Sequence, residues 1–348
     1  MTMSAGKLWG LRRLADDNGR FKMTAVDQRP PIKQLISDAR GLEPASDDDV
    51  RAVKRLLVEE LAKDSSALLL DPHHAYPAAI DVVPPAKGLL ITLEDSIFDE
   101  TPDGRRSSTI TNWSVEKIKR SGADAVKLLA WHRPDAATSV IDHQRALVAQ
   151  VGDACQRFDI PFVFELLTYA LADDTTELAH DAARRAEHVI RSVEDFSAVR
   201  FGVDLFKLES PLPPSQVPDP DDPEAGPVAQ AIFDELGRAA ARPWVMLSAG
   251  ADRSDFQRIL TFAYRAGASG FLAGRAIWRA PLQHFPDMDA SRGALRTDGA
   301  AYLRSIGNLT DTGAVPFFEH PAYGNDGPLL QGDLKDFRRT YGDFGGGS

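Results

Sequence analysis

Two strings in the middle of the chain, AVKLLAW at Ala125–Trp131 and FVFELLTY at Phe162–Tyr169, decide the predicted fold. Each is almost continuously apolar, which is typical of a strand that is buried on both faces. Between them lies Asp142–Phe158, whose apolar residues recur at helical spacing. A strand, a helix and a second strand in this order predict a parallel βαβ unit.

The same alternation continues on both sides of this unit. Six further apolar runs are strand-like: Phe21–Gln28, Ala67–Pro72, Gly88–Glu94, Leu205–Ser210, Trp244–Ala249 and Gly270–Arg275. Five further stretches are amphipathic: Asp48–Lys63, Ser114–Ser121, Glu177–Phe196, Pro227–Ala241 and Ser254–Ala266. Eight strands alternating with helices predict an α/β fold, the (β/α)8 TIM barrel, in a single domain. The alternative is an open doubly wound sheet, but no G-x-G-x-x-G string follows the first strand, which weighs against its dinucleotide-binding form.

The chain is predicted to divide into three segments. They are an N-terminal extension at residues 1–20, the barrel at residues 21–290, and a C-terminal helical segment at residues 291–348 with the flexible tail Phe344–Ser348. Pro211–Pro227 has an unusual composition, because it holds seven prolines and four carboxylates. It is either a stiff, solvated connection or a lid over a substrate site, since long loops after barrel strands often cover such sites.

The composition excludes several classes of protein. Of the 348 residues 43% are hydrophobic, which is not the composition of a disordered chain. The net charge of −11 argues against a nucleic-acid partner. No apolar run approaches the roughly 18 residues that span a membrane, and Met1–Gly19 lacks the features of a signal peptide. The single cysteine, Cys155, cannot form an internal disulfide or a cysteine metal cluster, which is consistent with the expected cytoplasmic location.

Three charged residues interrupt the apolar strands. Lys127 lies inside AVKLLAW, Glu165 inside FVFELLTY and Lys207 inside LFKLES. One interpretation is a buried ion cluster that serves folding specificity, although such clusters add little stability. The other interpretation is catalysis, because a lysine that attacks a carbonyl must be neutral, and burial or a second cation favours the neutral amine. In that case Lys127 is the proposed second cation and Glu165 the proton carrier of a Schiff-base site.

The last two strands end in small residues that suit an anion. SAGAD (Ser248–Asp252) follows the seventh strand, and AGRAIW (Ala273–Trp278) follows the eighth. Small residues let backbone N–H groups approach an anion, a following helix N-terminus favours it, and an arginine adds a forked donor. Barrels often bind phosphate at this position. The two strings together predict an anion site, with Arg275 as the forked donor.

Polar residues after other strands leave alternatives open. Asp27 and Gln28 end the first strand and either face the barrel mouth or cap the next helix. Arg133 follows the fourth strand and is a candidate ligand for a second phosphate. His73 and His74 are adjacent but lack the spacing of metal ligands, so no metal site is predicted.

Longer strings carry a family resemblance. They are AVDQRPPIKQLI, ALLLDPHHAYPA, GADAVKLLAW, FVFELLTY, RFGVDLFKLESP, PWVMLSAG and GASGFLAGRAIW, in consistent order from about Phe21 to about Trp278. Together they resemble the class I tagatose-1,6-bisphosphate aldolases, a family close to the bacterial sulfofructosephosphate aldolases. The resemblance implies a (β/α)8 barrel that cleaves ketose phosphates through a lysine Schiff base, with no metal and no other cofactor.

The resemblance also implies roles for individual residues. Lys207 in LFKLESP matches the Schiff-base lysine, and Glu165 in FELLTY and Lys127 in AVKLL match its partners. Asp27 and Gln28 in VDQR match residues near the dihydroxyacetone part of the substrate. Ser248, Gly250, Gly274 and Arg275 match the family's phosphate cradle.

The implied reaction is cleavage of tagatose 1,6-bisphosphate to dihydroxyacetone phosphate and glyceraldehyde 3-phosphate. FELLTY and the DP-x-x-x-x-P segment at Asp71 are nearer the tagatose enzymes, whereas LLAWHRPD is nearer the sulfosugar enzymes. Sulfofructose 1-phosphate and a deoxy-keto-gluconate phosphate therefore stay open as substrates. A non-catalytic sugar-phosphate-binding barrel is the other alternative, although binding alone needs no buried amine. The expected partner is a phosphorylated sugar, and a homo-oligomer is left open.

Overall fold

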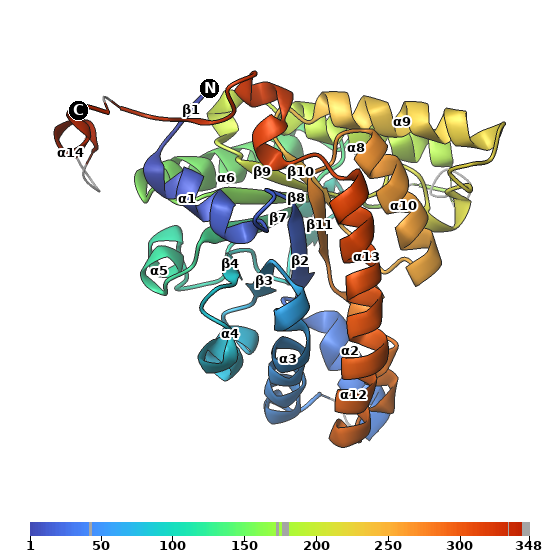
Figure 1. Cartoon of the computed structure of the whole chain (residues 1–348). Coiled ribbons are helices and arrows are strands. Elements are labelled where there is room, and N and C mark those ends of the chain that lie inside the picture. Colours follow the sequence, from blue (N-terminus) through green and yellow to red (C-terminus); the bar gives the residue numbers. More distant parts are fainter. Residues whose placement is uncertain (42–43, 172–173, 176–180, 333, 343–348) are drawn as a thin grey trace.

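The computed structural model describes residues 1–41, 44–171, 174–175, 181–332 and 334–342. At its centre is a closed barrel of parallel strands in the order β10–β11–β2–β3–β4–β7–β8–β9 (Figure 1). The strands are β2 (Phe21–Ala25), β3 (Ala67–Leu70), β4 (Gly88–Thr92), β7 (Ala125–Trp131), β8 (Phe162–Leu167), β9 (Leu205–Leu208), β10 (Trp244–Met246) and β11 (Gly270–Ala273). Pairing of β10 with β9 closes the sheet on itself, so the predicted barrel is confirmed and the open sheet is excluded.

Helices surround the barrel, and two of them begin at serine caps. Ser46 accepts hydrogen bonds from backbone N–H groups at the start of α3, and Ser114 does so at the start of α5. The helices after β2 are α2 (Pro30–Arg40), α3 (Asp47–Leu61), α4 (Ala75–Ala79), α5 (Val115–Arg120), α6 (Thr138–Arg157), α8 (Ala182–Phe196), α9 (Ala225–Ala239), α10 (Arg253–Arg265), α11 (Arg275–Trp278), α12 (Met288–Ala294), α13 (Ala300–Gly313) and α14 (Phe337–Thr340). Every predicted helix occurs, although the first residues of the one predicted at Glu177–Phe196 lie outside the described residues. None of the described helices is both long and apolar enough to span a membrane.

Alternating side chains divide the apolar core into two layers. One cluster fills the barrel interior and includes Ala125, Val163 and Leu205. Their sequence neighbours, such as Val126 and Phe164, belong to the cluster between the strands and the helices. Because side-chain direction alternates with period two along a strand, residues 127, 165 and 207 return to the interior, one layer nearer the carboxyl ends.

Both terminal segments pack at the amino-terminal end of the barrel. Leu11 of α1 (Ala5–Leu14) joins the interior cluster together with Phe317 and Tyr323 from the other end of the chain. Strand β1 (Thr2–Met3) pairs in parallel with β12 (Leu329–Leu330), so segments far apart in sequence lie side by side (Figure 1). The helix α13 contacts β2, α3 and α10 and so completes the outer ring. The boundaries at residues 20 and 290 stay predictions, and the predicted tail Phe344–Ser348 lies outside the described residues.

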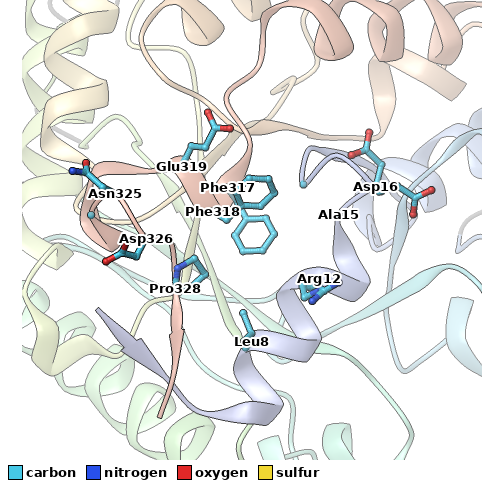
Figure 2. Close-up of a pocket in the computed structure, with 14 residues that line it drawn as sticks. Leu8, Arg12, Ala15, Asp16, Phe317, Phe318, Glu319, Asn325, Asp326 and Pro328 are labelled. Carbon is cyan, nitrogen blue, oxygen red and sulfur yellow. The ribbon is translucent and has the colours of Figure 1, made fainter. Parts of the chain in front are cut away.

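A cavity of about 710 Å³ lies between these terminal segments (Figure 2). Leu8 and Arg12 line one side of it, and Phe317 and Phe318 line the other. The backbone N–H of Phe317 donates to Gly19 O, just before β2 begins. The cavity therefore lies at the amino-terminal end of the strands, whereas barrel enzymes carry their active sites at the opposite end.

Candidate active site

Another cavity, of about 210 Å³, lies at the carboxyl ends of the strands. Six of the residues predicted for the site line it: Gln28, Glu165, Lys207, Ser248, Gly274 and Arg275. The Pro-rich segment Pro211–Pro227, all of which is described, contributes none of the lining residues. Instead, Arg258 Nε of α10 donates to Val217 O at 3.0 Å and holds this segment against the helix.

Lys207 and Glu165 form a buried pair at the wall of this cavity. Lys207 Nζ donates to Glu165 Oε2 at 2.8 Å, and the two residues are register partners on β9 and β8. Their side chains are 5% and 8% exposed. Burial opposes ionisation of Glu165, but the ammonium groups of Lys127 and Lys207 outweigh it and hold the pKa of this carboxyl below its usual value. A buried amine next to a carboxylate that reaches the same cavity is the arrangement that a Schiff-base nucleophile and its proton carrier need.

Lys127 lies behind this pair, with its side chain only 2% exposed. Its ammonium is 2.7 Å from Glu165 Oε2, 3.0 Å from Asp27 Oδ2 and 2.6 Å from Glu94 Oε1. Burial opposes the charge, but the three carboxylates outweigh it and raise the pKa of Lys127 well above its ordinary value. Lys127 therefore stays a cation that holds Glu165. The role of Lys127 as a second cation that favours the neutral amine of Lys207 remains a prediction, because three carboxylates surround the Lys127 ammonium.

Asp27 joins this cluster and does not cap a helix. Its Oδ2 accepts hydrogen bonds from Lys127 Nζ at 3.0 Å and from Thr92 Oγ1 at 3.2 Å. The N-cap of α2 is Arg29, whose side chain makes no capping bond. Burial opposes ionisation of Asp27, yet Lys127 and Lys207 hold the pKa of its carboxyl below the ordinary value. Asp27 therefore does not cap the next helix, and it lies in the buried cluster and not in the lining of the cavity.

Gly250 and Arg275 meet at one side of the cavity. Gly250 has φ +87°, a left-handed conformation that favours glycine, and a Cβ there would lie 3.1 Å from the Arg275 guanidinium. Among the described residues Arg275 forms no ion pair, and burial together with the nearby Arg279 lowers its pKa. An unpaired guanidinium beside an open cavity favours an anion. The helix that follows Gly274, α11, is only four residues long, whereas α10, which follows the Ser248–Asp252 loop, has 13 residues.

Gly274 and Gln28 both line the cavity and lie against each other. A Cβ at Gly274 would lie 2.6 Å from Ala25 O and 2.7 Å from Gln28 Nε2, so only glycine fits. The Oε1 atom of Gln28 is buried and has no hydrogen-bond partner in the described part of the chain. A buried acceptor without a partner costs free energy, and a substrate hydroxyl in the cavity would satisfy it.

Arg133 does not reach this cavity. Its guanidinium contacts Asp135 Oδ1 and Asp174 Oδ2, each at 2.7 Å, and lines a neighbouring cavity of about 250 Å³. Thr168 lines both cavities, so the two lie next to each other. Since Arg133 is already paired with two carboxylates, its contact with a second phosphate stays a prediction.

The histidines after β3 take part in a structural contact. His73 N and His74 N both donate to Asp71 Oδ1, and His74 Nε2 lies 3.0 Å from Asp47 Oδ1. Asp71 also binds Lys54, and both side chains of this ion pair are fully buried. The sequence analysis did not predict this ion pair, because Lys54 is one of several charged residues in α3.

Two carboxylates of the site, Glu94 and Glu209, are absent from the sequence-based predictions. Glu94 contacts the buried ammonium of Lys127, and Glu209 lines the cavity. Each lies two positions after an inward-facing strand residue, Thr92 and Lys207 respectively. Side chains two positions apart along a strand point to the same side. Continuing this alternation past the end of each strand would have predicted that Glu94 and Glu209 face inward.

Comparisons with known proteins show which family the chain belongs to. The family described as DeoC/LacD family aldolase matches residues 21–280. Tagatose 1,6-diphosphate aldolase of Listeria monocytogenes serovar 1/2a is 34% identical over 324 residues, which cover 91% of this chain and 95% of that protein. Tagatose 1,6-diphosphate aldolase 2 of Streptococcus mutans serotype c is 32% identical over 331 residues, which cover 93% of this chain and 100% of that protein.

One of the similar solved structures is a Schiff base-forming fructose-1,6-bisphosphate aldolase. Its TM-score is 0.54 at 16% identity, and the match covers 87% of this chain and 98% of that chain. At this identity the likeness supports the fold. The family match and the relatives above 30% identity, both spanning most of the chain, place the protein among aldolases: it belongs to the DeoC/LacD aldolase family.

Proposed function

We propose that this protein is a class I aldolase that cleaves tagatose 1,6-bisphosphate through an imine on Lys207. The observation that carries this proposal is the 2.8 Å contact between buried Lys207 Nζ and Glu165 Oε2, at a cavity that also holds the unpaired Arg275. The substrate is supported by the relatives from Listeria and Streptococcus, which are named tagatose 1,6-diphosphate aldolases.

In this proposal Arg275 and the backbone around Gly250 and Gly274 hold the C1 phosphate. Lys207 passes a proton to Glu165, and the neutral amine attacks the C2 ketone to form a carbinolamine. Glu165 returns that proton to the carbinolamine hydroxyl, which leaves as water, and a protonated imine remains. Glu165 takes the proton of the C4 hydroxyl, the C3–C4 bond breaks, and its electron pair moves into the imine to form an enamine. Glyceraldehyde 3-phosphate leaves. Protonation at C3 and hydrolysis then release dihydroxyacetone phosphate and return the free amine.

Borohydride reduction in the presence of dihydroxyacetone phosphate tests the imine. Peptide mapping is expected to find the reduced adduct on Lys207 and on no other lysine. Lys207→Arg keeps the charge but cannot form an imine, so it is expected to lose both the adduct and the cleavage activity. Lys117→Arg, at an exposed lysine, is the matched control. An adduct at another lysine, or loss of activity with a chelator, would contradict the mechanism.

A substrate panel tests the distal group separately. We expect the highest kcat/KM for tagatose 1,6-bisphosphate, measured beside fructose 1,6-bisphosphate, sulfofructose 1-phosphate and a deoxy-keto-gluconate phosphate. A preference for the sulfonate would overturn the substrate but leave the imine intact. A protein that binds these compounds without turnover would be a binding barrel.

We also infer a cytoplasmic location, because the proposed substrate is a phosphorylated metabolite that does not cross membranes unaided. Cell fractionation tests it. A homo-oligomer stays open, and light scattering of the purified protein measures it directly.

A further inference from the structure

Glu94 lies next to the candidate active site but does not line its cavity. It follows β4 and is only 3% exposed. Its Oε1 is 2.6 Å from Lys127 Nζ, and its Oε2 accepts a hydrogen bond from Leu129 N at 3.0 Å. One oxygen of this carboxylate therefore contacts Lys127, and the other contacts the backbone of β7, the strand on which Lys127 lies.

Arg29 fixes Glu94 from the other side. Its Nη1 and Nη2 each donate to Glu94 O at 3.1 Å, and Nη2 lies 3.5 Å from Glu94 Oε1. Glu94 thus lies between two cations, Arg29 and Lys127. Burial raises the pKa of Glu94 and Asp27 adds to this, while these two cations oppose it. The charge of Glu94 and the charge of Lys127 therefore depend on each other.

The ammonium of Lys127 connects Glu94 to the cavity, because it also contacts Glu165. It donates hydrogen bonds to Asp27 and Glu94 and lies 2.7 Å from Glu165 Oε2. Of these carboxylates only Glu165 lines the cavity. A change in how Glu94 holds the ammonium must therefore alter both the position and the basicity of Glu165.

We propose that Glu94 is a positioning residue of the aldolase reaction: it orients the Lys127 ammonium and balances its charge, so that Glu165 keeps the basicity that proton transfer needs. This inference rests on the proposed function of Lys207 and Glu165. It assigns Glu94 no contact with substrate, which separates its expected effect from that of a binding residue.

The test is Glu94→Gln, which removes the charge and one of the two acceptors. We expect kcat to fall about tenfold or more while KM changes less than about threefold, because Glu94 does not touch the substrate. The pH profile of kcat is expected to move to lower pH by about half a unit or more, because losing one buried negative charge makes the remaining protons easier to remove. Glu94→Asp keeps the charge and is expected to keep the wild-type profile, even with a lower kcat.

Glu100→Gln is the matched control, since Glu100 lies on the neighbouring hairpin with its side chain 62% exposed. If Glu94→Gln does not fold, Arg29→Met carries the test, with a shift to higher pH expected because it removes a positive charge. An unmoved profile in a folded variant, with activity reduced only in proportion to the folded fraction, would make Glu94 purely structural. That outcome differs from failure of the proposed function, in which the wild type itself forms no imine and both proposals fall.

Discussion

Lys127→Met removes the cation at the centre of the buried cluster and keeps a side chain of similar length. It leaves Asp27, Glu94 and Glu165 without ammonium contacts of 3.0, 2.6 and 2.7 Å. At an effective dielectric constant of about 20, each such contact is worth roughly 6 kcal/mol before desolvation is subtracted. Removing one partner of a buried ion pair costs about 3–5 kcal/mol net. We expect the upper end of that range near pH 8, because three carboxylates lose the same partner.

This loss of unfolding free energy depends on pH. In the wild type, burial opposes ionisation of Asp27 and Glu165, but the lysines outweigh it and lower their pKa values. Their stabilising contribution is therefore full above the ordinary carboxyl pKa and is lost as pH falls through the folded-state pKa. Without Lys127, Lys207 is the lysine left to oppose burial, so both pKa values rise and the variant loses less stability than the wild type as pH falls. The difference between wild type and variant is thus expected to shrink from about pH 8 to about pH 5.

Urea unfolding followed by circular dichroism at several pH values measures this difference. Lys117→Met is the control, because Lys117 is exposed and its ammonium donates to the backbone carbonyl of Asn112. Its effect is expected to stay within about 0.5 kcal/mol at every pH. A loss for Lys127→Met that is the same at pH 5 and pH 8, or that stays below about 1 kcal/mol, would refute the reasoning that the carboxylates depend on this cation.

Three further outcomes are expected. Arg275→Met should raise KM for the bisphosphate about 10- to 100-fold with little change in the unfolding midpoint, because this guanidinium has no ion-pair partner among the described residues. Steady-state kinetics and urea unfolding measure the two quantities, and a large fall in the midpoint would mean that Arg275 is mainly structural. Gly250→Ala should raise KM and lower stability by about 1 kcal/mol or more, given φ +87° and the 3.1 Å approach to Arg275, whereas Gly293→Ala, with nothing within 4 Å, should do neither. Lys54→Met should cost about 3–5 kcal/mol in thermal or urea unfolding, because its ion pair with Asp71 is fully buried; a neutral effect would mean that the pair is dispensable.

Sequence by itself determined the barrel and the centre of its candidate site. Strands buried on both faces must be apolar throughout, so the alternation of short apolar runs with amphipathic stretches is enough to predict a parallel, closed sheet. The same physics makes a charge inside such a run conspicuous, because an unpaired buried charge is too costly to persist. Lys127, Glu165 and Lys207 follow from that cost, and the period of two directs all three into the barrel.

Only the tertiary structure decided which partner each charge takes. Alternation gives the direction of a side chain but not the path of the loop that follows its strand. The contact of Glu94 with Lys127 and the pairing of Arg133 with Asp174 depend on those paths. The approach of Gly250 to Arg275 likewise depends on two loops that are close only once the barrel has closed. An ion pair is selected by distances of a few ångströms between residues far apart in sequence, and only packing sets those distances.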